Sequence, residues 1–118
     1  MADFEATRTD HASTVMVTLG GELDILTAPE FARRMGEVLM TLNPPRTLIL
    51  DLSALEFLGV AGARVLFSAA GTCTRIGSPM YVVAAPDSAA GSMLAGLDIT
   101  GTLKIVDRLD LVPGHQAS

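Results

Sequence analysis

The chain has little of the material from which covalent or metal-based sites are built. Among its 118 residues there is one cysteine, Cys73, and there are two histidines, His11 and His115. One cysteine cannot form a disulfide within the chain, and without a cluster of other ligands it does not make a zinc site. Neither histidine has a nucleophile near it in the sequence pattern. We therefore expect no bound metal, no cofactor and no catalytic centre.

Basic charge and long apolar runs are also scarce. Eight Lys and Arg residues stand against 13 Asp and Glu residues, which gives a net charge of −5 at pH 7. Nucleic acids and anionic membranes bind basic surfaces, and no apolar stretch reaches the roughly 20 residues needed to cross a bilayer. The first ten residues lack the apolar core of a signal peptide. The sequence therefore predicts a cytoplasmic protein that binds no nucleic acid and is not inserted directly into a membrane.

The composition is typical of a folded chain. Apolar residues make up 49% of the sequence and charged residues 18%, which is too apolar and too poor in charge for a disordered protein. A chain of this length buries roughly two-thirds of its extended surface, so it can fold without a covalent or metal staple. We expect a single domain over residues 1–118, with a core from about residue 4 to residue 111 and a flexible tail at 112–118.

Hydrophobic periodicity predicts strands and helices that alternate along most of the chain. Val15, Val17 and Leu19 recur at every second position, which is typical of a strand. After Thr27, apolar residues recur three and four positions apart, as in an amphipathic helix, and Thr27 and Glu30 have the spacing of a capping box. The predicted strands cover residues 3–8, 13–19, 47–51, 80–84 and 103–106, and the predicted helices cover 28–42, 59–76 and 88–97.

Glycine, proline and capping residues mark the boundaries of these elements. We expect Gly20–Gly21 to end the second strand, Asn43–Pro45 the first helix and Gly77 the second helix. Asp87 or Ser88 is expected to cap the third helix. Because helices connect successive strands, the inner strands should run parallel. The sequence thus predicts a small α/β domain with a mixed sheet of four to five strands and three to four helices.

Carboxylates near strand ends are the first candidates for chemistry. Glu22 and Asp24 lie between a strand and a helix, where they could bind a metal, act as a catalytic pair, form a solvated loop or contact a partner. No histidine or third carboxylate is near them in the sequence, which favours the loop and the interface. Asp51 ends a buried strand, where phospho-acceptors occur in doubly wound sheets. However, Lys104 lies inside the last predicted strand and the chain is one strand–helix unit too short, so a phospho-receiver is disfavoured.

The segment Phe57–Gly62 joins a central strand to a helix and is the most informative part of the chain. Gly59 and Gly62 form a fragment of a dinucleotide-binding fingerprint at a helix N-terminus, which favours an anion. Alternatively, the small residues let the helix start close to the sheet. Leu58 and Val60 are apolar where we expect the loop to reach the surface, which is typical of a contact site.

Charged residues are sparse in the second half of the sequence. Only Arg64, Arg75 and Asp87 are charged between Phe57 and Leu97. So few charges do not cover a solvated surface, which predicts that part of this stretch contacts a partner protein.

Four short motifs follow one another along the chain: Leu19–Asp24, Thr27–Pro29, Leu50–Ser53 with Phe57–Gly62, and Gly96–Asp98. Together they resemble the STAS domain, the family of sulfate-transporter tails and anti-sigma factor antagonists. The resemblance covers roughly Phe4–Leu111 and implies a small STAS-like α/β fold. Family members usually end with a helix of about a dozen residues, whereas Asp107–Leu111 leaves room for scarcely one turn.

Stand-alone members of this size are mostly anti-sigma factor antagonists. The resemblance therefore implies a non-enzymatic regulator of transcription that binds an anti-sigma factor of the GHKL serine-kinase type and so frees a sigma factor. In that family, phosphorylation of one serine at the start of the second helix prevents binding. Val60 occupies this position and has no hydroxyl, so we expect that phosphorylation at this site does not control the chain.

The resemblance leaves other functions open. The chain could be a cytoplasmic STAS subunit of a membrane lipid or anion transporter, or a sensor that binds a nucleotide or small anion at the start of the second helix. A homodimer is open as well. The residues expected to contact the partner lie in the acidic loop and around the start of the second helix: Glu22, Asp24, Leu58, Gly59, Val60, Ala61, Gly62 and Arg64.

Overall fold

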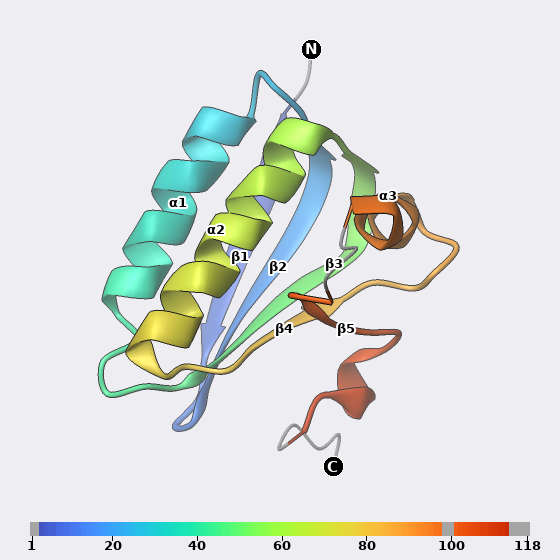
Figure 1. Cartoon of the computed structure of the whole chain (residues 1–118). Helices are drawn as coiled ribbons and strands as arrows, with labels where there is room; N and C mark the ends of the chain where they lie inside the picture. The colour runs from blue at the N-terminus through green and yellow to red at the C-terminus, as the bar shows by residue number, and fades with distance from the viewer. Residues whose placement is uncertain (1–2, 98–100, 114–118) are drawn as a thin grey trace.

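Strands and helices alternate along the described part of the chain, which is residues 3–97 and 101–113 of a computed structural model (Figure 1). The elements are, in chain order, β1 (Phe4–Asp10), β2 (Thr14–Leu23), α1 (Ala28–Met40), β3 (Thr47–Leu58), α2 (Val60–Ile76), β4 (Met80–Val83), α3 (Ala89–Leu97), β5 (Lys104–Val106) and a 3-10 turn (Leu109–Leu111). Asp98 of the fourth motif and residues 114–118 of the predicted tail lie outside the described residues.

The strands form one mixed sheet in the order β1-β2-β3-β4-β5. β1 pairs antiparallel with β2, whereas the other neighbours pair in parallel. The helices α1 and α2 connect parallel strands and lie side by side on one face of the sheet (Figure 1). The predicted α/β fold with parallel inner strands is therefore confirmed, with five strands and three helices in the described ranges.

The first half of the central strand β3 is buried on both faces of the sheet. Leu48, Leu50 and Leu52 are inaccessible to solvent and belong to the main core, with the helices. Ile49 lies between them, is equally buried, and belongs to a second cluster. This two-sided burial explains why the strand is a continuous apolar run in the sequence.

A short C-terminal segment packs on the face of the sheet opposite to α1 and α2. The 3-10 turn Leu109–Leu111 matches the single turn for which the sequence leaves room. Val112 follows it, is 2% exposed and shares a cluster with Ile49 and Val83. The packed part of the chain therefore extends at least to Val112, one residue beyond the predicted core boundary.

The prediction that Gly20–Gly21 ends the second strand is wrong, because β2 continues to Leu23. Gly21 has a φ of +83°, and a Cβ there would lie 2.6 Å from the backbone oxygen of Asp3. Glycine adopts a positive φ without strain and has no Cβ to clash with Asp3. The chain therefore remains paired with β1 and β3 where another residue would interrupt the sheet.

β3 is also longer than predicted and extends to Leu58. Its register with β2 shifts twice, and at each shift β3 contains one more residue than β2. These irregularities are β-bulges, which change the face to which the following side chains point. Buried residues therefore recur at every third position, at Leu52, Leu55 and Leu58, where a regular strand would bury every second one.

Two of the predicted helix boundaries are confirmed, whereas α1 ends at Met40, two residues before the predicted end at residue 42 and ahead of Asn43–Pro45. Gly77 ends α2 in the left-handed conformation, with a φ of +77°. Ser88 caps α3, because its hydroxyl accepts a hydrogen bond of 3.0 Å from the N–H of Gly91. The capping box predicted from Thr27 and Glu30 is wrong, since Thr27 makes no side-chain cap hydrogen bond to α1.

Candidate docking surface

Three segments that are far apart in the sequence meet at one end of the sheet, at the top of Figure 1. They are the loop from β2 to α1, the end of β3 and the beginning of α2. Leu23 pairs with Leu58 at the last position of the β2–β3 ladder, and the N–H of Gly59 donates a 2.8 Å hydrogen bond to the oxygen of Leu23. Because β2 and β3 are parallel, both strands deliver their following loops to the same edge.

Side-chain hydrogen bonds fix the loop between Glu22 and Thr27. One carboxylate oxygen of Asp24 accepts hydrogen bonds from the N–H groups of Leu26 and Thr27, at 2.9 and 3.1 Å. The hydroxyl of Thr27 accepts one from the N–H of Asp24 and donates one to the backbone oxygen of Glu22, both at 2.9 Å. Short polar side chains commonly stabilise turns in this way. Asp24 therefore shapes the loop, a role that the sequence alone did not assign.

The tip of this loop presents two large apolar side chains to solvent. Ile25 is 78% exposed and Leu26 is 76% exposed. Beside them, Val60 at the start of α2 is 49% exposed and Phe57 in β3 is 46% exposed. Ile25, Phe57 and Val60 line one shallow groove of about 570 Å³. We call these three residues, together with Leu26 next to Ile25 in the loop, the apolar patch; exposed apolar groups that gather in this way mark contact sites.

The sequence identified one member of the apolar patch, Val60, and missed the other three. Leu58, which we expected at the surface, is only 1% exposed. The bulges in β3 are the reason, because they turn Leu58 into the core and Phe57 outward. Ile25 and Leu26 were missed because Glu22 and Asp24 were considered only for their charge, and not for the turn that Asp24 forms with the backbone.

Close packing explains both glycines of the predicted anion loop. A Cβ on Gly62 would lie 2.9 Å from the Cβ of Leu23 and 3.0 Å from its backbone oxygen. A Cβ on Gly59 would lie 3.1 Å from the ring of Phe57. Glycine at these positions lets α2 begin directly against the end of β2, which is the structural alternative that the sequence left open.

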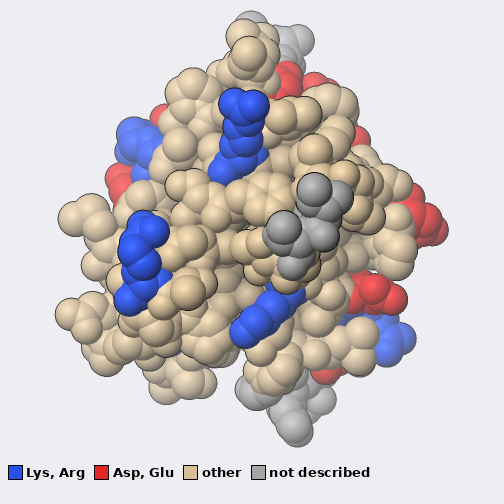
Figure 2. All heavy atoms as spheres, viewed as in Figure 1, with Lys and Arg blue, Asp and Glu red and all other residues tan. Residues whose placement is uncertain are grey.

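The eight predicted contact residues divide into three groups. Leu58 and Gly62 are buried, and Glu22 is half-buried at the end of β2. The groove next to the apolar patch is lined by the others: Asp24, Gly59, Val60, Ala61 and Arg64. Arg64 is exposed and takes part in none of the ion pairs formed by the described residues. Figure 2, which looks onto the face with α1 and α2, shows isolated basic side chains on a mainly uncharged surface, with acidic side chains toward its margins.

The groups that could carry chemistry do not converge. Among residues 3–97 and 101–113, no three His, Cys, Asp or Glu side chains are grouped so that they could hold a metal ion. Asp51 lies within β3 and accepts a hydrogen bond from the N–H of Ser53, so it does not stand at a strand end as expected. Cys73 is 1% exposed, and burial raises the pKa of its thiol, which keeps it in the unreactive protonated form. The site is therefore suited to apolar contact with another molecule.

A family model described as the STAS domain matches residues 3–113. The chain belongs to the STAS domain family. No helix in the described part of this STAS domain is both long enough and apolar enough to cross a membrane.

Among relatives in sequence, this STAS domain is similar to the anti-sigma-F factor antagonist RsfB of Mycobacterium tuberculosis, in two strains. The two sequences are 40% identical over 68 residues, which cover 58% of this chain and 52% of RsfB. The match thus spans about half the length of these curated relatives.

Among solved structures, the domain is similar to an anti-sigma factor antagonist from Mycobacterium paratuberculosis. That chain is 33% identical, with a TM-score of 0.71, and the match covers 92% of this chain and 89% of the other. The anti-sigma factor antagonist SpoIIAA in its unphosphorylated form has a TM-score of 0.68 at 15% identity, over 92% of this chain and 91% of its own. At that identity the likeness to SpoIIAA concerns the fold alone.

Proposed function

We propose that this STAS domain is a non-enzymatic anti-sigma factor antagonist, which binds an anti-sigma factor through the apolar patch and thereby frees a sigma factor. The observation that carries the proposal is the apolar patch itself, in which four large side chains, 46 to 78% exposed, gather beside a hydrogen-bonded loop. Interfaces are typically built around such apolar centres. The names of the relatives at 40% and 33% identity support the choice of partner. A cytoplasmic site of action belongs to the same proposal.

The proposal includes the way in which binding is controlled. Val60 is the first residue of α2 and its side chain is half-exposed. The resemblance to STAS antagonists implies that it stands where they carry the phospho-acceptor serine. A phosphoryl group would bring a charge of about −1.5 to −2 into the apolar patch and would disfavour an apolar interface. Valine cannot accept one. The chain therefore binds a serine-kinase anti-sigma factor of the GHKL type without being switched off at this position.

A charge introduced into the apolar patch tests the docking surface. Val60→Asp should weaken binding to the purified anti-sigma factor by more than tenfold, or over about 1.4 kcal/mol. The free chain should stay folded, because a carboxylate in the first turn of a helix interacts favourably with the helix dipole. Isothermal titration calorimetry gives the affinity, and thermal unfolding of the free variant gives the stability.

The matched control is Ile76→Asp, at the other end of the same helix. Ile76 is 40% exposed, close to the exposure of Val60, but lies in the last turn of α2, away from the apolar patch. This variant should bind with wild-type affinity. Equal affinities for Val60→Asp and wild type would place the contact surface elsewhere. If none of the host's anti-sigma factors binds the wild-type chain, the proposed function itself is wrong.

Restoring a hydroxyl tests the proposed loss of phosphorylation control. Incubated with a kinase-type anti-sigma factor and ATP, the wild-type chain should keep its mass, whereas Val60→Ser should gain one phosphoryl group, because its hydroxyl lies at the exposed start of α2. Intact-protein mass spectrometry measures both. A phosphoryl group on Ser53 or Thr72 of the wild type would contradict the proposal and show that control lies at another residue.

A further inference from the structure

We infer that Ile25 and Leu26 are the anchor of this interface. They enter an apolar pocket on the anti-sigma factor, and Arg64 pairs with a carboxylate at the rim of that pocket. The inference rests on the proposed function, and it goes further by assigning the residues that carry the binding energy and the chemistry that the partner must present.

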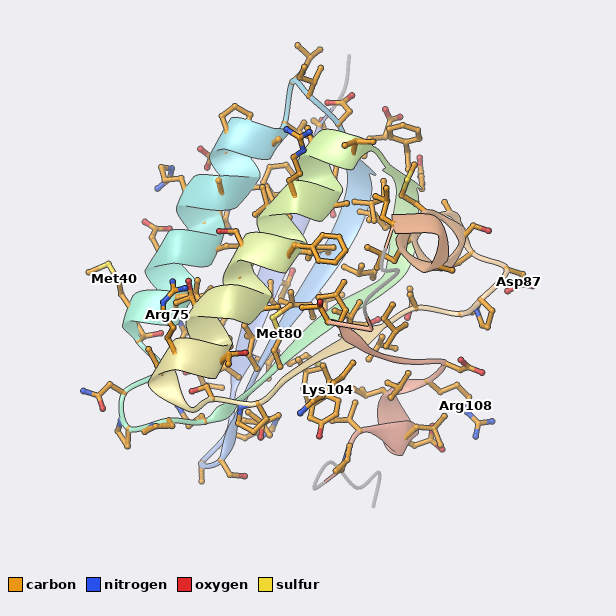
Figure 3. All side chains as sticks on the ribbon, viewed as in Figure 1. Met40, Arg75, Met80, Asp87, Lys104 and Arg108 are labelled. Carbon is orange, nitrogen blue, oxygen red and sulfur yellow. The ribbon has the colours of Figure 1, made fainter. Side chains whose placement is uncertain are left out.

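The exposure of the two side chains is the first argument. Ile25 and Leu26 are 78% and 76% exposed, and among the large apolar residues of the described chain only Met40 is more exposed, at 85%. Met40 is the last residue of α1, at the end remote from the loop, where Figure 3 shows it projecting away from the body of the domain. Ile25, in contrast, lines the same groove as Phe57 and Val60, and Leu26 follows it in the loop. Burying such side chains is favourable in proportion to the apolar area removed from water.

The fixed conformation of the loop is the second argument. Four hydrogen bonds from Asp24 and Thr27 hold the backbone on both sides of Ile25 and Leu26. Thr27 itself is only 8% exposed, so its hydroxyl is committed to the loop. A loop that is ordered before binding loses little conformational entropy when it binds. The hydrogen bonds therefore stabilise a loop conformation in which the side chains of Ile25 and Leu26 are exposed to solvent.

The shape and charge around the pair indicate the kind of partner. The pair stands at the tip of a loop, with the groove of Phe57, Val60 and Ala61 behind it, so a surface that buries both must be concave where they enter. Arg64 lies at the same groove and forms none of the ion pairs of the described residues, whereas Asp24 is already engaged with backbone N–H groups. The relatives at 40% and 33% identity are antagonists of anti-sigma factors, which favours a different protein over a second copy as the occupant. A different protein with an apolar pocket would bury Ile25 and Leu26, and a carboxylate at the rim of that pocket would pair with Arg64.

Truncating each anchor residue tests the inference. Ile25→Ala and Leu26→Ala should each weaken binding to the purified anti-sigma factor by about 30-fold, the loss that defines an interface hot spot. Both variants should unfold at the wild-type temperature, because an exposed side chain contributes little to folding. Met40→Ala is the matched control: it removes an equally exposed apolar side chain far from the loop and should leave the affinity within about twofold.

A charge variant tests the rim contact separately. Arg64→Gln should lower the association rate at low salt, and the salt dependence of that rate should weaken, because a rim charge mainly steers encounter. Surface plasmon resonance at several salt concentrations measures both. Arg75→Gln, at the opposite end of α2, is its control and should change neither.

These experiments distinguish an error in the anchor residues from an error in the proposed function. Wild-type affinity for both alanine variants, while Val60→Asp still weakens binding, would overturn the anchor and leave the proposed function standing. Failure of the wild-type chain to bind any of the host's anti-sigma factors would remove the proposed function itself, and the anchor with it. Self-association of the chain, or its binding to anionic lipid vesicles, would also overturn the anchor if Ile25→Ala abolished it, because the pair would then serve another partner.

Discussion

Gly91→Ala should destabilise the folded chain by about 3 kcal/mol, the upper part of the range for overpacked sites. A Cβ on Gly91 would lie only 1.9 Å from the backbone oxygen of Ala85. That oxygen also accepts hydrogen bonds from the N–H and the hydroxyl of Ser88, at 3.0 and 2.6 Å. The added methyl group must therefore either displace α3 or break the turn that caps it. Displacing α3 would disturb Ala90 and Leu94, which are fully buried in the main core.

Urea unfolding followed by circular dichroism measures this loss, and Gly36→Ala is the matched control. Gly36 lies inside α1 with nothing within 4 Å of its added Cβ. The same change there should stabilise the chain by about 0.5 to 1 kcal/mol, because alanine is the better helix former. If Gly91→Ala unfolded at the wild-type urea concentration, the close approach of α3 to residue 85 would be disproved.

The regular parts of this fold can be predicted because one physical cause dominates each of them. The run Thr47–Asp51 is apolar on both faces since β3 is covered on both faces, and α1 presents a single apolar stripe since one of its sides meets the sheet. Gly77 ends α2 because glycine adopts the left-handed conformation without strain. In each case the local pattern and the tertiary environment demand the same residues.

The irregular parts could not be predicted, because they depend on pairing between distant segments. The bulges in β3 exist only relative to β2, and they decide that Phe57 faces solvent and Leu58 the core. Similarly, Gly21 continues β2 because β1 approaches it too closely for a side chain, a fact about the neighbouring strand. In the sequence alone, two consecutive glycines are typical of the end of a strand.

The candidate site also contains residues that the sequence predicts and residues that it does not. Val60 could be found from the sequence because it lies at a helix start within a recognisable motif. For Ile25 and Leu26 the sequence carries a weaker signal: Asp24 and Thr27 enclose the two apolar residues, and their side chains can bond the backbone between them. Such a pair of turn-forming residues predicts a loop of fixed conformation. Apolar side chains within such a loop at the surface remain exposed to solvent.

Phe31→Ala should cost about 3 to 5 kcal/mol of stability, the range for removing a phenylalanine side chain from a core. Phe31 lies in the first turn of α1, is inaccessible to solvent, and packs edge-to-face on Phe4 of β1 with ring centroids 6.0 Å apart. The substitution leaves a cavity between α1 and the sheet and removes the aromatic pair, which itself contributes about 0.5 to 1.5 kcal/mol. Phe31→Leu is the control and should lose less stability than Phe31→Ala, since leucine fills part of the space that alanine leaves empty.

Phe31→Ala also separates stability from binding. The hydrogen bonds that fix the loop join Asp24, Thr27 and Glu22, and none of them uses the phenylalanine ring. The folded fraction of Phe31→Ala should therefore bind the anti-sigma factor almost as well as the wild type, with an apparent affinity reduced only by the fraction unfolded. Ile25→Ala should do the reverse, losing affinity at unchanged stability. Parallel losses of affinity and stability in both variants would mean that the apolar patch is maintained by the whole core and that the loop is no independent docking element.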